Sequence, residues 1–232
     1  MTTFVLVHGA YHGAWCWARL TPELERFGHR TIAMDLPCDD AQAGYSQYTA
    51  TVLAAMDAAG IGEDAIVVGH SLGGFTIPLV AEKRRVARLV FLCTAPTIKG
   101  APDALRARMV TDEYLAIARF TDDAGRTVFA PRDARKAFFH DCDEPTAAWA
   151  ISQLRPQGSP PLANPWPVTR WPDVPRSVIL TRDDCAIRLS AGLEAARVIL
   201  DGGEAIVLEG SHSPFLSRPA QLAGVLHGLT RS

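Results

Sequence analysis

The chain has 232 residues, of which 23 are Lys or Arg and 25 are Asp or Glu, giving a formal net charge of −2. A chain of this length folds as one large domain with a single core, and it needs neither disulfides nor metals for stability. The balanced charge gives no electrostatic reason to expect binding to nucleic acid or to an anionic membrane.

The five cysteines stand apart in the chain, with no CxxC pair and no spacing typical of zinc sites: Cys16, Cys38, Cys93, Cys142 and Cys185. An odd number of dispersed cysteines is typical of a reducing compartment. No signal-peptide pattern precedes the first apolar run, and no apolar run is long enough to span a bilayer. We therefore expect a soluble cytoplasmic protein. Its oligomeric state stays open, with a homodimer as one option.

Short apolar runs without polar alternation recur along the chain, a pattern that suits parallel strands buried on both faces. They cover residues 4–7, 31–34, 65–68, 88–92, 177–180 and 205–208. Helical stretches lie among them, at residues 17–27, 48–59, 72–83, 189–200 and 219–229. Gly28 and Gly60 follow two of these helices, where a C-cap glycine belongs. The alternation predicts an α/β fold built on a doubly wound, mostly parallel sheet.

Residues 95–175 interrupt this alternation with a helical and loop-like pattern that contains no recognisable strand. The stretch ends in a proline-rich return with Pro160, Pro161, Pro165, Pro167, Pro172 and Pro175. Prolines exclude helix there. A segment this long between two strands of one sheet indicates an inserted helical cap rather than a plain loop. We predict a single domain over residues 1–232 with a cap at 95–175.

The clearest chemical motif is Gly69-His70-Ser71-Leu72-Gly73, which follows a predicted strand and opens a predicted helix. In this context G-x-S-x-G is a nucleophile elbow, which presents its serine on a sharp turn. The glycines avoid collisions with neighbouring backbone. The free N–H groups at the helix N-terminus favour negative charge that develops beside the serine. Ser71 is therefore the predicted nucleophile.

A serine hydroxyl needs a base within hydrogen-bond reach, and in this fold the chain order is serine, acid, histidine. His212 lies in the loop after the last predicted strand, where this base belongs. The acid is expected after the strand at 177–180, where Asp183 and Asp184 are adjacent. One of them should orient the imidazole, and spacing alone does not choose between them.

An acyl-transfer site also needs N–H donors for the developing oxyanion. One should be the N–H of Leu72, directly after the nucleophile, and the other should come from the loop after the first strand, which begins at His8. Tyr11 and His12, in the same loop, are the residues expected to contact substrate. This chemistry implies no metal and no cofactor.

Residues 4–15 read FVLVHGAYHGAW, residues 33–37 read AMDLP, and residues 210–219 read GSHSPFLSRP. Together with the elbow, these stretches resemble the plant methylesterase and hydroxynitrile lyase branch of the α/β-hydrolase superfamily and its bacterial relatives. The resemblance is weak across the cap, where substrate choice lies. It implies that Ala10 and Leu72 supply the oxyanion N–H groups. It also places the acid three residues before an aliphatic position, here Ile187, and so favours Asp184.

Lyases of this branch carry a threonine at the position of Gly9, and a lysine that handles cyanide at the position of Ser213. The resemblance therefore implies a carboxylic-ester hydrolase that acts on a small-molecule ester through a Ser-His-Asp triad and an acyl-enzyme. A cation reaching in from the cap, such as Arg155 or Arg170, would weaken this distinction. The alternatives are a hydroxynitrile lyase or another carbon–carbon bond-cleaving enzyme and, in a different class, a ligand receptor with little turnover.

Overall fold

The computed structural model describes residues 1–96 and 108–231, so residues 97–107 of the predicted cap lie outside the described residues. A six-stranded sheet has the order β2-β1-β3-β4-β7-β8, and every neighbouring pair is parallel. Its strands are β1 (Thr3–Val7), β2 (Arg30–Ala33), β3 (Ile66–His70), β4 (Arg88–Leu92), β7 (Arg176–Thr181) and β8 (Ile206–Leu208). The predicted doubly wound parallel sheet is confirmed.

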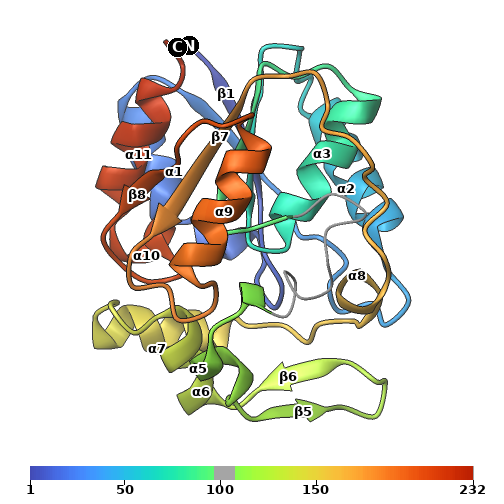
Figure 1. Cartoon of the computed structure of the whole chain (residues 1–232), viewed down its shortest axis with the longest axis vertical. Helices are drawn as coiled ribbons and strands as arrows, with labels where there is room; N and C mark the ends of the chain where they lie inside the picture. Colours follow the sequence, from blue (N-terminus) through green and yellow to red (C-terminus); the bar gives the residue numbers. More distant parts are fainter. Residues whose placement is uncertain (97–107, 232) are drawn as a thin grey trace.

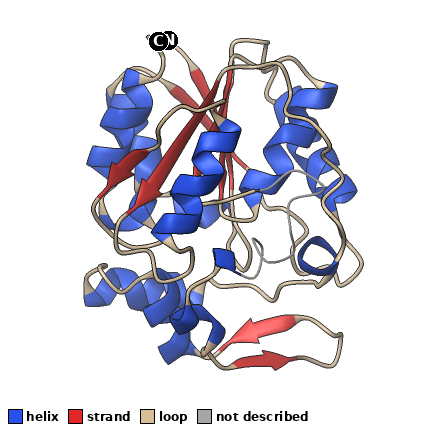
Figure 2. Cartoon of the chain, in the orientation of Figure 1, coloured by secondary structure: helices blue, strands red, loops and turns tan. Residues whose placement is uncertain are grey.

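Helices cover both faces of this sheet, as Figures 1 and 2 show. One face carries α2 (Tyr45–Ala58), α3 (Gly73–Lys83) and α9 (Leu189–Ile199). The other carries the 3-10 helix η1 (Ala14–Trp17), α1 (Leu20–Arg26), α10 (Pro214–Ser217) and α11 (Pro219–Gly228). None of the described helices is long and apolar enough to cross a membrane.

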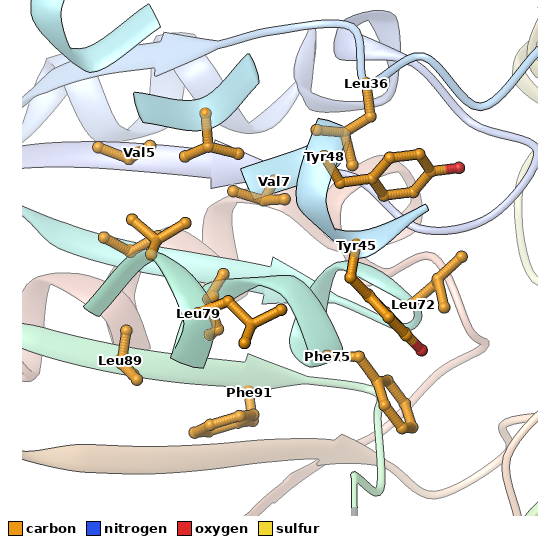
Figure 3. Close-up of a cluster of buried hydrophobic side chains, with 14 of the residues drawn as sticks. Val5, Val7, Leu36, Tyr45, Tyr48, Leu72, Phe75, Leu79, Leu89 and Phe91 are labelled. Carbon is orange, nitrogen blue, oxygen red and sulfur yellow. The ribbon is translucent and has the colours of Figure 1, made fainter. Parts of the chain in front are cut away.

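Two apolar cores result, because successive side chains of a strand point to opposite faces of the sheet. Val5 and Val7 of β1 belong to one core, and Phe4 and Leu6 belong to the other. Figure 3 shows the first core, in which strand side chains gather beneath those of α2 and α3. Full burial of each such side chain contributes about 1.5–3 kcal/mol, so burial on both faces explains the uninterrupted apolar runs in the sequence.

The described helices and strands between β4 and β7 lie at the carboxyl ends of the sheet strands, at the end of the molecule opposite the two termini (Figure 1). The helices are α5 (Asp112–Leu115), α6 (Pro131–Phe138), α7 (Glu144–Ser152) and α8 (Pro160–Ala163). The strands, β5 (Arg119–Thr121) and β6 (Thr127–Phe129), form an antiparallel hairpin. After α8, residues 164–175 run back along the molecule to the start of β7.

The expectation that residues 95–175 contain no strand is therefore wrong. Strands of three residues are too short to show a clear period of two. The expectation that prolines exclude helix from the return is also wrong, because α8 begins with Pro160 and Pro161 at the first helical positions, where proline is tolerated.

Backbone hydrogen bonds join the cap segment to loops of the core. Arg155 N donates to Tyr11 O over 2.8 Å, and Gly158 N donates to Cys38 O over 2.6 Å. On the other side of the cap, Thr111 N donates to Ala186 O over 3.1 Å. These bonds hold the cap segment over the loops that follow β1, β2 and β7.

Glycines end α1 and α2 as predicted. Gly28 and Gly60 adopt φ angles of +77° and +63°, in the left-handed region that favours glycine. A Cβ at either position would meet no atom within 4 Å, so backbone conformation alone disfavours other residues there.

Alanine at two glycine positions should change the free energy of unfolding in opposite directions. Gly28→Ala places a Cβ in the left-handed region and should destabilise the fold by about 1 kcal/mol. Gly224 lies on the exposed side of α11 with open space around it, so Gly224→Ala should stabilise by about 0.5–1 kcal/mol. Urea unfolding measures both changes. A loss of stability in Gly224→Ala would contradict the helical conformation of α11.

Candidate active site

The strand order places a switch point between β1 and β3, because β2 lies on one side of β1 and the later strands lie on the other. Ligands of doubly wound sheets bind outside the carboxyl ends of the strands at this point. A cavity of about 390 Å³ opens there, and its lining includes Ala10 and Tyr11 from the loop after β1. Ser71 and Leu72, from the turn after β3, also line it.

The turn after β3 has the geometry of a nucleophile elbow. Ser71 has a φ of +49°, and its N–H donates to Leu92 O over 3.0 Å. A Cβ at Gly69 would lie 2.6 Å from Gly73 O, and one at Gly73 would lie 2.5 Å from Val7 O. These distances are too short for any side chain, so the turn requires glycine on both sides of Ser71.

The predicted oxyanion donors lie beside this serine. Ala10 and Leu72 both line the cavity, and neither backbone N–H has an acceptor among the described residues. Gly9 brings the two loops together, because a Cβ at this position would lie only 2.8 Å from Ser71 Cβ. Two N–H groups near one hydroxyl can stabilise negative charge on a carbonyl oxygen that this hydroxyl attacks.

The structure brings His212 and Asp184 together in a buried pair. His212 Nδ1–H donates to Asp184 Oδ2 over 2.8 Å, and their side chains are only 2% and 3% exposed. Asp184 Oδ1 accepts the N–H groups of Ala186 and Ile187 over 2.7 and 2.9 Å, which fixes the carboxylate. Because the proton of the neutral ring lies on Nδ1, its Nε2 is left as an acceptor.

His212 lines the same cavity as Ser71. Among the described residues, no hydrogen bond joins the Ser71 hydroxyl to this ring. Catalytic hydrogen bonds are often long in unliganded enzymes and shorten when substrate binds.

Asp183, the alternative acid, points elsewhere. It is exposed, and its Oδ2 accepts the N–H of Gly210 over 3.3 Å. It therefore supports the loop that carries His212 without contacting the imidazole. Of the adjacent pair, only Asp184 is placed to orient the ring.

Three buried histidines hold backbone atoms around the site. His70 Nε2–H donates to His212 O over 2.9 Å, and His8 Nδ1–H donates to Gly9 O over 2.8 Å. His12 Nδ1–H donates to Ala10 O over 2.7 Å. Burial lowers the pKa of His8 to about 4 and that of His12 to about 3, so both rings are neutral near pH 7.

Of the two residues expected to contact substrate, His12 lies outside the cavity lining. Its side chain is fully buried and stacks on Trp15. Its hydrogen bond to Ala10 O fixes the loop that carries this predicted oxyanion donor. Tyr11, the other residue expected to contact substrate, does line the cavity.

The rest of the cavity lining is mostly apolar, and it includes one cationic side chain among the described residues. This cation is Arg119, which lies 4.3 Å from the centroid of the Tyr114 ring and donates to Tyr114 O over 2.6 Å. The cations considered from sequence, Arg155 and Arg170, do not line the cavity. Arg155 instead donates to Asp39 Oδ1 over 2.6 Å.

Sequence reasoning missed two residues that support or line the site. Gln157 is fully buried, accepts the N–H of Tyr11 over 3.3 Å and donates to the Tyr48 hydroxyl over 3.0 Å. It lies just before the proline-rich return, where no local pattern marks it. Arg119 lies on the hairpin that was not predicted. Within residues 1–96 and 108–231, no group of His, Cys, Asp and Glu side chains could hold a metal ion.

Comparison with known proteins gives a family and several relatives. The sequence model of the alpha/beta hydrolase family matches residues 4–225. A probable esterase, PIR7A, from Oryza sativa subsp. indica is 39% identical over 106 residues, which cover 42% of this chain and 40% of that protein. Methylesterase 2 from Arabidopsis thaliana is 32% identical over 151 residues, or 57% of each chain. The matched part thus spans well under two thirds of these relatives.

Among solved structures, polyneuridine aldehyde esterase superposes with a TM-score of 0.84 over 99% of both chains, at 21% sequence identity. At this identity the likeness establishes the shared fold alone. This superposition includes described residues outside the part that aligns with the curated relatives.

Asparagine at the two adjacent aspartates should separate their roles. Asp184→Asn loses the carboxylate that holds Nδ1–H of His212, so labelling of Ser71 by a fluorophosphonate should slow by as much as about 10⁴-fold, the loss that the equivalent change causes in kcat of a serine protease. Asp183→Asn should slow labelling far less. Mass spectrometry of the labelled peptide over time measures both rates, and a greater loss in Asp183→Asn would reverse the assignment.

Because the buried histidines are neutral, the free energy of unfolding should depend on pH. Their folded pKa values lie below the unfolded value of about 6.5, so only the unfolded chain takes up their protons as the pH falls from there toward 4. The free energy of unfolding should therefore fall over this range. His12→Asn keeps a donor for Ala10 O and should reduce the slope by up to about 1.4 kcal/mol per pH unit. Urea unfolding between pH 7 and 4 measures the slope, and an unchanged slope would contradict a neutral His12.

Proposed function

Because the chain belongs to the alpha/beta hydrolase family, we propose that it is a carboxylic-ester hydrolase that works through Ser71, His212 and Asp184. The observation that carries the proposal is that three chemical features lie at one cavity. They are a serine on a glycine-bounded elbow, a histidine held by a buried carboxylate, and two N–H groups without acceptors among the described residues. The names of the rice and Arabidopsis relatives, an esterase and a methylesterase, support an ester substrate.

The proposed reaction passes through an acyl-enzyme. Ser71 Oγ attacks the ester carbonyl while His212 Nε2 takes the hydroxyl proton, and Asp184 stabilises the imidazolium that forms. The N–H groups of Ala10 and Leu72 bind the oxyanion of the tetrahedral intermediate. His212 then protonates the departing alcohol. Water attacks the acyl-enzyme with His212 again as base, and the carboxylic acid leaves as Ser71 regains its proton.

The cavity indicates a small ester with an apolar body. Its volume of about 390 Å³ lies in the range typical of small-molecule sites, and Phe75, Met109, Phe138 and Ile187 contribute to its lining. Each buried methylene of a ligand gains about 0.8 kcal/mol in such surroundings. We therefore expect apolar contacts to supply most of the binding energy of the substrate, and the N–H groups to stabilise the oxyanion that forms during the reaction.

One observation keeps the hydroxynitrile lyase as a second candidate. Cyanide leaves as an anion and needs a cation, and Arg119 is a cation in the cavity lining. Three features favour the esterase. Arg119 already donates to Tyr114 O and lies over the Tyr114 ring. Ser213, at the position where the lyases carry lysine, is fully buried outside the cavity lining. At Gly9, where the lyases carry threonine, a side chain would collide with Ser71.

Purified protein should hydrolyse p-nitrophenyl acetate and release little or no cyanide from mandelonitrile. Ser71→Ala should lose ester turnover by up to about 10⁶-fold, as in subtilisin, together with fluorophosphonate labelling. The matched control is Ser190→Ala, an exposed serine of α9 that should retain both. Spectrophotometric assays of nitrophenolate and cyanide measure the two activities.

Two results would contradict the esterase. Cyanide release that exceeds ester turnover and is lost in both Ser71→Ala and Arg119→Gln would favour the lyase. Saturable binding of an ester without turnover in the wild-type protein would favour a receptor.

A further inference from the structure

A second cavity, of about 160 Å³, lies in the cap beside the active-site cavity. Tyr11 is the one described residue that lines both. We propose that the Tyr11 side chain is the wall between the two cavities and sets the greatest length of apolar chain that the ester substrate can carry. This inference rests on the proposed ester hydrolase function and adds a residue that determines specificity.

The backbone of Tyr11 is fixed in an unusual conformation. Its φ is +66°, a region that a bulky residue adopts only when its surroundings hold it there. Two hydrogen bonds from the cap segment do so. Tyr11 N donates to Gln157 Oε1 over 3.3 Å, and Arg155 N donates to Tyr11 O over 2.8 Å. The direction in which the side chain leaves the backbone is therefore set from both sides.

The ring is held as firmly as the backbone. It packs edge to face on Phe129 at a centroid distance of 4.5 Å, and it lies 6.3 Å from the ring of Phe138. Tyr11 is only 3% exposed although it borders two cavities. Burial raises the pKa of its hydroxyl, so the group stays neutral and protonated. A neutral aromatic ring packed in this way forms a rigid partition.

The lining of the second cavity is mostly apolar. Val128, Phe129, Ala134 and Ile151 contribute to its lining. Arg155 also lines it, but its guanidinium donates to Leu36 O and to Asp39 Oδ1 over 3.1 and 2.6 Å. The charge is thus already satisfied outside the cavity. An apolar chain is the substituent that would gain from reaching this space.

Removal of the wall should lengthen the accepted chain. We expect Tyr11→Ala to raise the ratio of kcat/KM for p-nitrophenyl octanoate to that for p-nitrophenyl acetate by about fourfold for each methylene that enters the second cavity. Tyr11→Phe keeps the ring and should keep the wild-type ratio. A parallel series, octyl acetate against ethyl acetate, detects the same change if the long chain belongs to the alcohol.

A substitution in the cap provides the matched control. Ala134 on α6 is fully buried and lines only the second cavity. Ala134→Leu partly fills that space, so it should leave both wild-type ratios unchanged and should reverse the gain when combined with Tyr11→Ala. Tyr11→Gly is a second opened variant for the case that Tyr11→Ala does not fold, because glycine adopts a φ of +66° without strain.

The proposal would be overturned if Tyr11→Ala and Tyr11→Gly both kept the wild-type ratios of kcat/KM for long to short esters in both ester series. This result would leave the proposed esterase function intact. A gain that persists in the double variant would also overturn the proposal, because the long chain would then lie elsewhere. An opened variant that has lost turnover is assayed by Ser71 labelling with octyl and ethyl fluorophosphonates, and the same ratios apply. Failure of the wild-type protein to hydrolyse any ester would instead refute the proposed function.

Discussion

The carboxyl ends of β1 and β3 approach each other so closely that only glycine fits between them. A Cβ at Gly73 would lie 2.5 Å from Val7 O, and one at Gly9 would lie 2.8 Å from Ser71 Cβ. This contact brings the serine beside Ala10 and Leu72 before any substrate is present. Catalytic groups that are positioned in advance do not lose rate to reorganisation during the reaction, which is why a rigid sheet edge suits this chemistry.

Much of the central fold could be predicted because it depends on local patterns. Strands buried on both faces must be apolar throughout, and the observed strands lie within two residues of the apolar runs. The family match and the methylesterase relatives confirm the resemblance stated from three short stretches of sequence. The hairpin of β5 and β6 was not predicted, because strands of three residues carry little periodicity.

The candidate site was predictable where chemistry dictates chain order, and not where tertiary contacts decide. Ser71 and His212 could be chosen from motif and order, whereas Asp184 needed the resemblance because its neighbour has the same carboxyl group. Only the folded chain distinguishes them, through the two N–H groups that direct Asp184 toward the imidazole. The burial of His12 could not be inferred from its place in the sequence. Gln157 acts on a loop 146 residues away, beyond any local pattern.

Because Arg155 and Gln157 bond to Tyr11, both the core and the cap support the loop after β1, which carries the proposed oxyanion donor Ala10. Grafting a foreign cap onto this core would therefore alter the loop after β1 as well as the cavity, since the replaced segment includes the two residues, Arg155 and Gln157, that hold Tyr11. An exchange of caps between related proteins would therefore have to transfer residue 11 together with residues 155 and 157. The cap is one stretch of chain between β4 and β7, yet it cannot be exchanged independently of the loop after β1.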